Sequence, residues 1–266
     1  MERAQRVNAT FEVLADVPEI LTSASIPLSS IDSIIWSHHH VDHTGDVSLF
    51  PPITSLVVGP GFKTNPSTYP GFPLNPDSHL SHSNFAGRDV FELDFNSTTG
   101  VLKLAGLRAI DWFDDGSLYF LEAPGHAPEY IMALARTSAD KFVLLAGDIA
   151  SHPGIIRPSP LRPIPESIPL SDSSSRTRPF FEPTSYIMPD PVAGRTTLAA
   201  LQAFDASEHV LVVLDHDPSL RESSSPLTLA RWEEPRGDHA SARQYENRKD
   251  AVHWRFLDDF RRSVDV

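Results

Sequence analysis

Four short apolar segments of this chain are each followed, within five residues, by a side chain that can bind a metal ion. They are rich in β-branched residues and bounded by turn residues, which is typical of buried β-strands. The segments are residues 31–36, 118–121, 142–146 and 210–214. Because ligand sites of α/β proteins gather just beyond the ends of strands, this recurrence predicts a sheet that assembles one metal site.

Helical periodicity is found before, between and after these segments. We expect further strands at 55–58 and 106–110, the latter forming a hairpin with 118–121 around Asp115-Gly116. Apolar residues recur at helical spacing in 10–22, 196–204 and 250–261, and Pro18 is expected to end or kink the first of these helices. Strands interleaved with helices indicate an α/β or α+β fold, which we expect to form a single domain over 1–266.

The first strand end carries a dense histidine motif, since residues 36–46 read WSHHHVDHTGD. Side chains two residues apart in an extended segment project to the same side, so His38 and His40 can bind one cation while His39 points away. Once the chain turns, Asp42 and His43 can present an oxygen and a nitrogen to a second cation. The other strand ends add His126 after Pro-Gly, Asp148 after Gly147, and His216 between two aspartates.

Composition restricts the chemistry further. The chain has 12 histidines and no cysteine, which excludes disulfides, thiolate zinc sites, iron–sulfur clusters and a cysteine nucleophile. Its 22 basic and 35 acidic residues give a net charge of −13, a poor match for nucleic acid. With no membrane-length apolar segment and no signal peptide pattern, we expect a cytoplasmic protein without a nucleic-acid or membrane partner.

In this order, the motifs resemble those of the metallo-β-lactamase superfamily, over roughly residues 10–220. The resemblance implies a four-layer αββα sandwich with a binuclear site, usually of two zinc ions, with iron or manganese as alternatives. It implies that one metal is bound by His38, His40 and His126, that the other is bound by Asp42, His43 and His216, and that Asp148 bridges the two.

A site of this kind suits hydrolysis. Three neutral imidazoles leave zinc an open position for water, and a second ion allows one hydroxide to bridge both metals. The predicted catalytic residues are Asp42 and Asp148, with Asp42 or His152 returning a proton to the leaving group. We therefore expect a metal-dependent hydrolase that opens a small lactone or lactam, in secondary-metabolite or xenobiotic metabolism.

Two alternatives stay open, a thioesterase of glyoxalase II or biosynthetic type and a non-catalytic metal-binding interaction protein. Homoserine lactones are less expected as substrates, because Ser151 stands where the lactonases of the superfamily carry a tyrosine. The substrate is therefore expected to be another small ester, amide or thioester.

The proline- and serine-rich stretch 153–191 lies between Asp148 and His216 and is expected to cover the active site. The side chains proposed for substrate contact are those of His152, Phe180, Phe181, Tyr186 and Met188.

The front of the chain departs from the superfamily pattern, in which two or three strands precede the first helix. Here the predicted helix 10–22 begins almost at once, so one sheet is expected to lack its N-terminal strands. An unpaired sheet edge favours association, which makes a homodimer an expectation.

Overall fold

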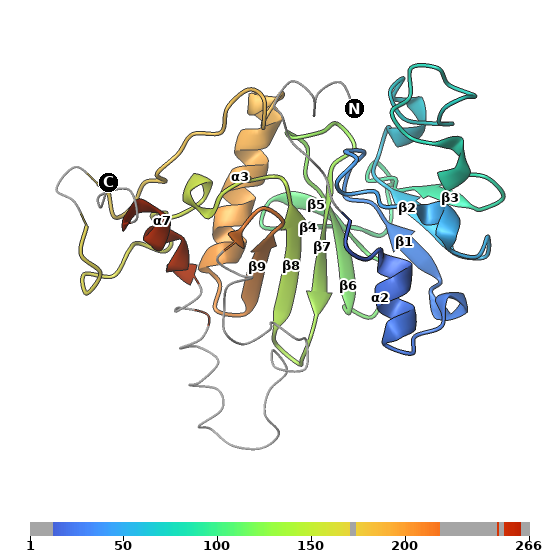
Figure 1. Cartoon of the computed structure of the whole chain (residues 1–266). Helices are drawn as coiled ribbons and strands as arrows, with labels where there is room; N and C mark the ends of the chain where they lie inside the picture. The colour runs from blue at the N-terminus through green and yellow to red at the C-terminus, as the bar shows by residue number, and fades with distance from the viewer. Residues whose placement is uncertain (1–12, 171–173, 219–248, 250–252, 262–266) are drawn as a thin grey trace. The chain divides into compact units, whose positions relative to one another are not determined.

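The computed structural model of the protein describes residues 13–170, 174–218, 249 and 253–261 (Figure 1). The chain forms two compact units, the first ending at Leu93 and the second beginning at Asp94. Within the described residues, each unit has its own sheet, with three strands in the first and six in the second. This mixture of sheets and helices confirms the predicted α/β class.

The sheet of the first unit is entirely parallel and runs in the order β1 (Ser33–Ile35), β2 (Ser55–Val58) and β3 (Val90–Glu92). Ile34 pairs with Leu56, which in turn pairs with Val90. Short 3₁₀ helices fill the connections: η1 (Leu28–Ser30), η2 (Val47–Leu49), η3 (Phe62–Thr64) and η4 (His82–Asn84). The core of the unit consists of Trp36, Val47, Leu56, Val58, Phe62, Leu80 and Phe85.

Helix α2 (Val17–Ser23) corrects one sequence expectation. Asp16 caps it by accepting a hydrogen bond from the Glu19 backbone N–H, and the Glu19 carboxylate accepts one from Asp16 in return. Pro18 therefore lies in the first turn, where no N–H is needed, so it helps to begin the helix and does not end it. No strand precedes α2 within residues 13–93.

The sheet of the second unit follows chain order: β4 (Val101–Leu104), β5 (Leu107–Asp111), β6 (Leu118–Glu122), β7 (Ile131–Arg136), β8 (Phe142–Gly147) and β9 (Val210–Leu214). Neighbours are antiparallel except β8 and β9, which are parallel because the chain between them crosses over through a helix. The expected hairpin is present between β5 and β6, with Gly116 at a φ of +72° in its turn.

That crossover helix is α3 (Pro191–Ala206), which is capped by Asp190 and buries Thr197, Leu201 and Phe204. Its buried face belongs to the main core of the unit, together with residues of β5 to β9. The segment after β8 contains η5 (Pro153–Ile155), and the end of the described chain contains η6 (Arg255–Leu257) and α7 (Asp258–Arg261).

These last elements form a second, smaller cluster of the unit. Ile164 from the proline-rich stretch packs with Trp254, Phe256 and Leu257, and partly buried side chains surround them, including Phe180 and Phe260. The helix predicted at 250–261 is therefore divided between a 3₁₀ turn and α7, and residues 250–252 lie outside the described part.

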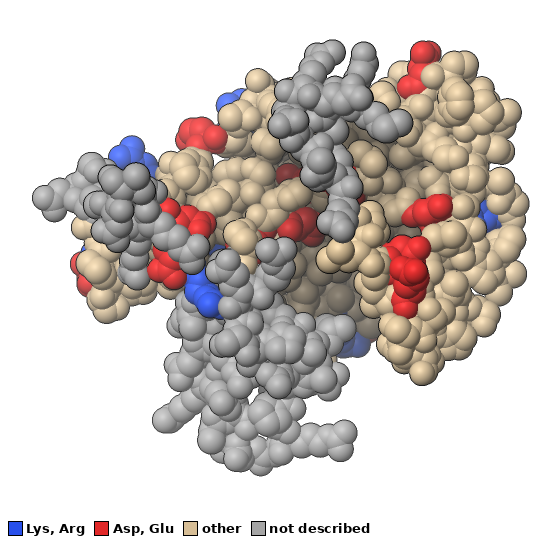
Figure 2. All heavy atoms as spheres, viewed as in Figure 1, with Lys and Arg blue, Asp and Glu red and all other residues tan. Residues whose placement is uncertain are grey.

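On the face of the molecule drawn in Figure 2, acidic side chains outnumber basic ones. Figure 2 shows them gathered in several groups on the face drawn, whereas the basic side chains there are few and scattered. Over the part of the chain that the structure describes, no helix is both long and apolar enough to cross a membrane.

Candidate functional site

Trp36 fixes the start of the histidine loop in the first unit. Its side chain is only 2% exposed and packs against Phe62 and Phe85, with both pairs of ring centroids 5.9 Å apart. The indole Nε1 donates a 2.9 Å hydrogen bond to the carbonyl oxygen of Thr44. Because this bond joins the two ends of the loop, residues 37–43 are held as a compact turn directly after β1.

This loop brings four of the predicted ligands together. The ring of His38, which is 1% exposed, lies 4.5 Å from the rings of both His40 and His43 between centroids. His38 and His40 offer ligand atoms within 4.8 Å of one another. The carboxylate of Asp42 lies 3.4 Å from Nε2 of His43. His39 belongs to neither pair, and its ring lies 6.5 Å from that of His38 and 5.0 Å from that of His40.

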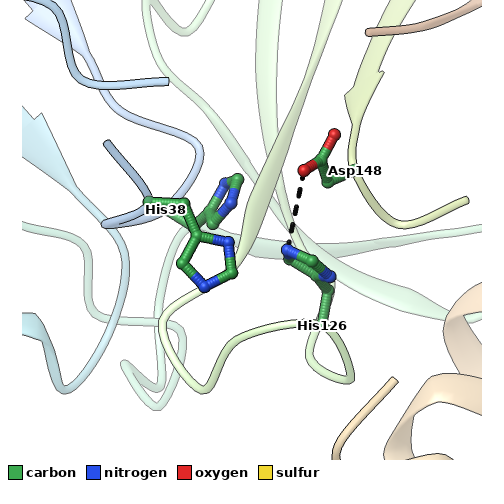
Figure 3. Close-up of side chains that lie close together, drawn as sticks. His38, His126 and Asp148 are labelled. Carbon is green, nitrogen blue, oxygen red and sulfur yellow. Dashed lines mark ion pairs between the residues drawn. The ribbon is translucent and has the colours of Figure 1, made fainter. Parts of the chain in front are cut away.

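The second unit brings together the other three predicted ligands, His126, Asp148 and His216. Nδ1 of His126 lies 2.6 Å from the carbonyl oxygen of Ile187, and because a carbonyl only accepts, Nδ1 carries the proton. The lone pair of His126 is therefore on Nε2, which lies 3.7 Å from Oδ2 of Asp148 (Figure 3). This is the tautomer and orientation that a metal-binding histidine needs.

The two oxygens of Asp148 face different imidazoles. While Oδ2 faces His126, Oδ1 lies 3.0 Å from Nε2 of His216, which follows β9. A carboxylate placed between two histidines in this way can bind one cation through each oxygen. The arrangement thus fits a bridging ligand, and a donor set of imidazole and carboxylate suits zinc.

The turn that carries His126 packs against α3. Thr197 donates a hydrogen bond of 2.8 Å to the carbonyl of Pro124, and a Cβ on Gly125 would lie 2.5 Å from Sδ of Met188 and 2.7 Å from Cα of Gly194. Met188 is 1% exposed under this turn. The expectation that Met188 contacts substrate is therefore wrong, because its side chain is used in packing.

Tyr130, the residue before β7, supports the same region. Its fully buried hydroxyl donates to the carbonyl of Ala146 at 2.9 Å and accepts from the backbone N–H of Asp148 at 2.5 Å. Burial, and secondly the charge of Asp148, raises the pKa of Tyr130 well above its ordinary value. The phenol thus stays protonated across the neutral range.

The residues predicted to contact the substrate lie in different surroundings. His152 accepts at Nδ1 from the Gly154 N–H (2.9 Å), and its Nε2 lies 3.2 Å from the carboxylate of Asp259. Its ring lies 5.2 Å from that of Phe181, which stacks on Phe260 at 5.6 Å. The ring of Phe180 also stacks on that of Phe260, at 4.6 Å, and Tyr186 is 69% exposed.

Sequence reasoning missed the supporting residues Trp36, Tyr130 and Ile187. Ile187 acts through its backbone carbonyl, which gives no signal in a sequence. Tyr130 offered a weak signal, since it follows the Pro-Gly-His motif closely, but its contact with Asp148 depends on the pairing of β7 with β8.

Known proteins are similar to this chain in sequence. The model of the metallo-β-lactamase superfamily matches residues 7–196. The protein named metallo-hydrolase mfmC, from Annulohypoxylon moriforme, is 36% identical over 269 residues, covering 92% of this chain and 67% of that protein. Gamma-lactamase FDB1 from Fusarium pseudograminearum is 39% identical over 235 residues, covering 79% of this chain and 56% of that protein.

The fold is also found among solved structures. An N-acyl homoserine lactone hydrolase, with the product N-hexanoyl-L-homoserine bound at its catalytic metal centre, matches with a TM-score of 0.50 at 16% identity, covering 79% of this chain and 66% of that one. The chain thus spans between about half and two thirds of the length of these three proteins. The extent of the family match confirms the resemblance seen in the motifs: this chain belongs to the metallo-β-lactamase superfamily.

Proposed function

We propose that this chain is a metal-dependent hydrolase that opens a small lactam or lactone ring. The observation that carries the proposal is the carboxylate of Asp148, whose two oxygens face the imidazoles of His126 and His216 in a chain of the metallo-β-lactamase superfamily. A binuclear site needs a carboxylate that binds both metals, whereas two separate mononuclear sites would not need one.

The proposed centre holds two zinc ions. One ion would be held by His38, His40 and His126, the other by Asp42, His43 and His216, and Asp148 would bind both. When bound, the ions supply a hydroxide nucleophile at neutral pH and an electrophile for the carbonyl oxygen of the substrate. Support comes from the donor pairs within each unit and from the family.

The residues of the chain then have separate tasks. The Ile187 carbonyl keeps the proton of His126 on Nδ1, so that Nε2 is the donor atom. Asp42, whose side chain is 45% exposed, is the proposed proton donor to the leaving group. His152 is less suited to that task, because Gly154 and Asp259 already engage both of its ring nitrogens. We propose that it contributes instead to a substrate-contacting surface with Phe180, Phe181 and Tyr186.

The proposed substrate class rests on the relatives. The Fusarium relative is named a gamma-lactamase, and the solved neighbour is a lactone hydrolase. Lactams and lactones share an acyl carbon that a hydroxide can attack and a leaving group that stays tethered after ring opening. We propose five-membered lactams as the first substrates to test.

The test is metal analysis combined with a hydrolysis screen. Purified protein should contain zinc, and the opening of γ-lactams, γ-lactones or thioesters should stop when a chelator removes the metal. Less than one zinc or iron per chain in folded protein would count against the proposal. Hydrolysis of thioesters alone would favour the thioesterase alternative.

Ligand variants sharpen the test. His126→Ala and Asp148→Asn should each lower turnover by more than the roughly 10- to 100-fold that is typical of losing an outer-shell partner. His39→Ala removes an imidazole from the same loop as His38 and should change turnover little. Equal losses at His39 would contradict the proposed ligand set.

A further inference from the structure

We propose that Tyr130 is a positioning residue of the metal centre, whose hydroxyl fixes the Gly147–Asp148 turn and so the direction of the Asp148 carboxylate. This inference rests on the proposed function, because it concerns the residue that would bridge the metals. Tyr130 donates no ligand atom to the proposed set.

The hydroxyl holds the main chain on both sides of Gly147. It donates to the carbonyl of Ala146 at 2.9 Å and accepts from the N–H of Asp148 at 2.5 Å. The pairing of β8 with β9 shifts register between Leu145 and Gly147, so the regular ladder is interrupted here. Tyr130 thus supplies hydrogen bonds at the point where the strand turns toward Asp148.

Gly147 is matched to this hydroxyl. Its φ is +55°, in the left-handed region, and a Cβ built on it would overlap the Tyr130 hydroxyl oxygen. Any larger residue would displace the phenol oxygen or the turn. Because the two residues approach each other so closely, the conformation of the Gly147 turn depends on the Tyr130 hydroxyl. The aromatic ring without the hydroxyl would not hold the turn in place.

Tyr130 also contacts the neighbouring ligand. Its ring lies 5.6 Å from the ring of His126 at an interplanar angle of 84°, an edge-to-face arrangement. One buried side chain therefore touches the imidazole of His126 and the backbone of Asp148, the two residues that face each other across 3.7 Å. A displacement of Tyr130 would change the separation and angle of this pair.

The first test removes only the hydroxyl. In Tyr130→Phe, zinc affinity measured by competition with a chromogenic chelator should fall by about 10- to 100-fold, which is usual when a residue that positions a metal ligand by hydrogen bonding is removed. The visible spectrum of the cobalt-substituted protein should also shift. Tyr119→Phe, the same change on the adjacent strand β6, is the control and should leave both measurements unchanged.

The second test does not depend on metal. In metal-free protein, the amide hydrogen of Asp148 should exchange faster in Tyr130→Phe than in the wild type, because its acceptor is gone, whereas amides in the middle of β7 should keep their protection. An unchanged exchange rate of Asp148 would overturn the inference. Wild-type protein that binds no zinc would overturn the proposed function, while the exchange comparison would still decide the role of Tyr130.

A double variant distinguishes a specific effect of the Tyr130 hydroxyl from a general loss of stability. Gly147→Ala should unfold at a lower denaturant concentration than the wild type, because the new Cβ collides with the hydroxyl. In the Tyr130→Phe background the colliding atom is absent, so the same glycine substitution should shift the midpoint less. Equal shifts in both backgrounds would show that the hydroxyl is not part of the turn.

Discussion

The indole Nε1 of Trp36 lies 2.9 Å from the carbonyl oxygen of Thr44 and joins the two ends of the loop that carries His38, His40 and His43. The ligand pattern of this loop can be read directly from the sequence, but its shape depends on this bond. Loops without such a closing contact hold side chains less accurately, and a metal centre tolerates little displacement of its ligands.

Trp36→Phe should therefore weaken both the fold and metal binding. The substitution keeps an aromatic ring against Phe62 and Phe85 but leaves the Thr44 carbonyl without the indole, at an expected cost of about 1–3 kcal/mol in the free energy of unfolding. Zinc affinity should fall by about 10-fold or more, as it does when residues that position metal ligands are removed. Trp112→Phe, in the β5–β6 hairpin, is the matched control, and a similar loss of zinc affinity in it would contradict the role of Trp36.

Gly125→Ala should strongly destabilise the second unit. The new Cβ would meet Sδ of Met188 at 2.5 Å and Cα of Gly194 at 2.7 Å, and Gly125 has a φ of +143°. Crowding and backbone strain together predict a loss of about 2–5 kcal/mol, measured by chemical denaturation. Gly100→Ala is the control, because Gly100 also has a positive φ, of +77°, but nothing lies within 4 Å of its Cβ position. Equal losses would mean that backbone strain alone, and not contact with α3, decides the effect.

Arg157 and Asp205 form a buried ion pair near the end of α3, with Nη2 of the arginine 2.7 Å from the carboxylate. Arg157→Met should cost about 3–5 kcal/mol, because it leaves a buried carboxylate without its guanidinium. The double variant Arg157→Met, Asp205→Leu should lose less than the sum of the single changes, because it removes both charges. Arg178→Met, at an exposed arginine, should change stability by less than about 0.5 kcal/mol.

His253 should make stability depend on pH. Burial, and secondly the charge of Arg157, lowers the pKa of this imidazole well below its ordinary value, so it is neutral in the folded protein. Below a pH of about 6.5 the unfolded chain binds a proton that the folded chain does not, so stability is lost as the pH falls, by at most about 1.4 kcal/mol per pH unit. Above that pH no such loss occurs.

The measurement is chemical denaturation of metal-free protein between roughly pH 7.5 and pH 5, in a range set by the ordinary histidine pKa. His253→Gln cannot take up the proton, so the stability of the wild type should fall more steeply than that of the variant. Parallel curves would show that His253 does not titrate differently in the folded and unfolded states.

The sequence by itself determined the chemistry of the candidate site. With no cysteine in the chain, imidazole and carboxylate were the available ligands, and the spacing of His38, His40, Asp42 and His43 on one short segment predicted which donors would lie together. Strands β2 and β9 were predicted with their observed limits, because each is an apolar run bounded by clear turn residues. The substrate and the complete ligand set are proposals.

Tertiary structure decided what local patterns could not. β7 reads IMALAR, a run of good helix formers, and becomes a strand because β6 and β8 supply hydrogen bonds along both of its edges. The tautomer of His126 depends on a carbonyl 61 residues away, at Ile187, and the turn at Asp148 depends on a hydroxyl 18 residues away, at Tyr130. Which donor meets which acceptor at such separations is set by the packing of the sheet and α3, since the residue types alone allow many pairings and only the folded chain selects one.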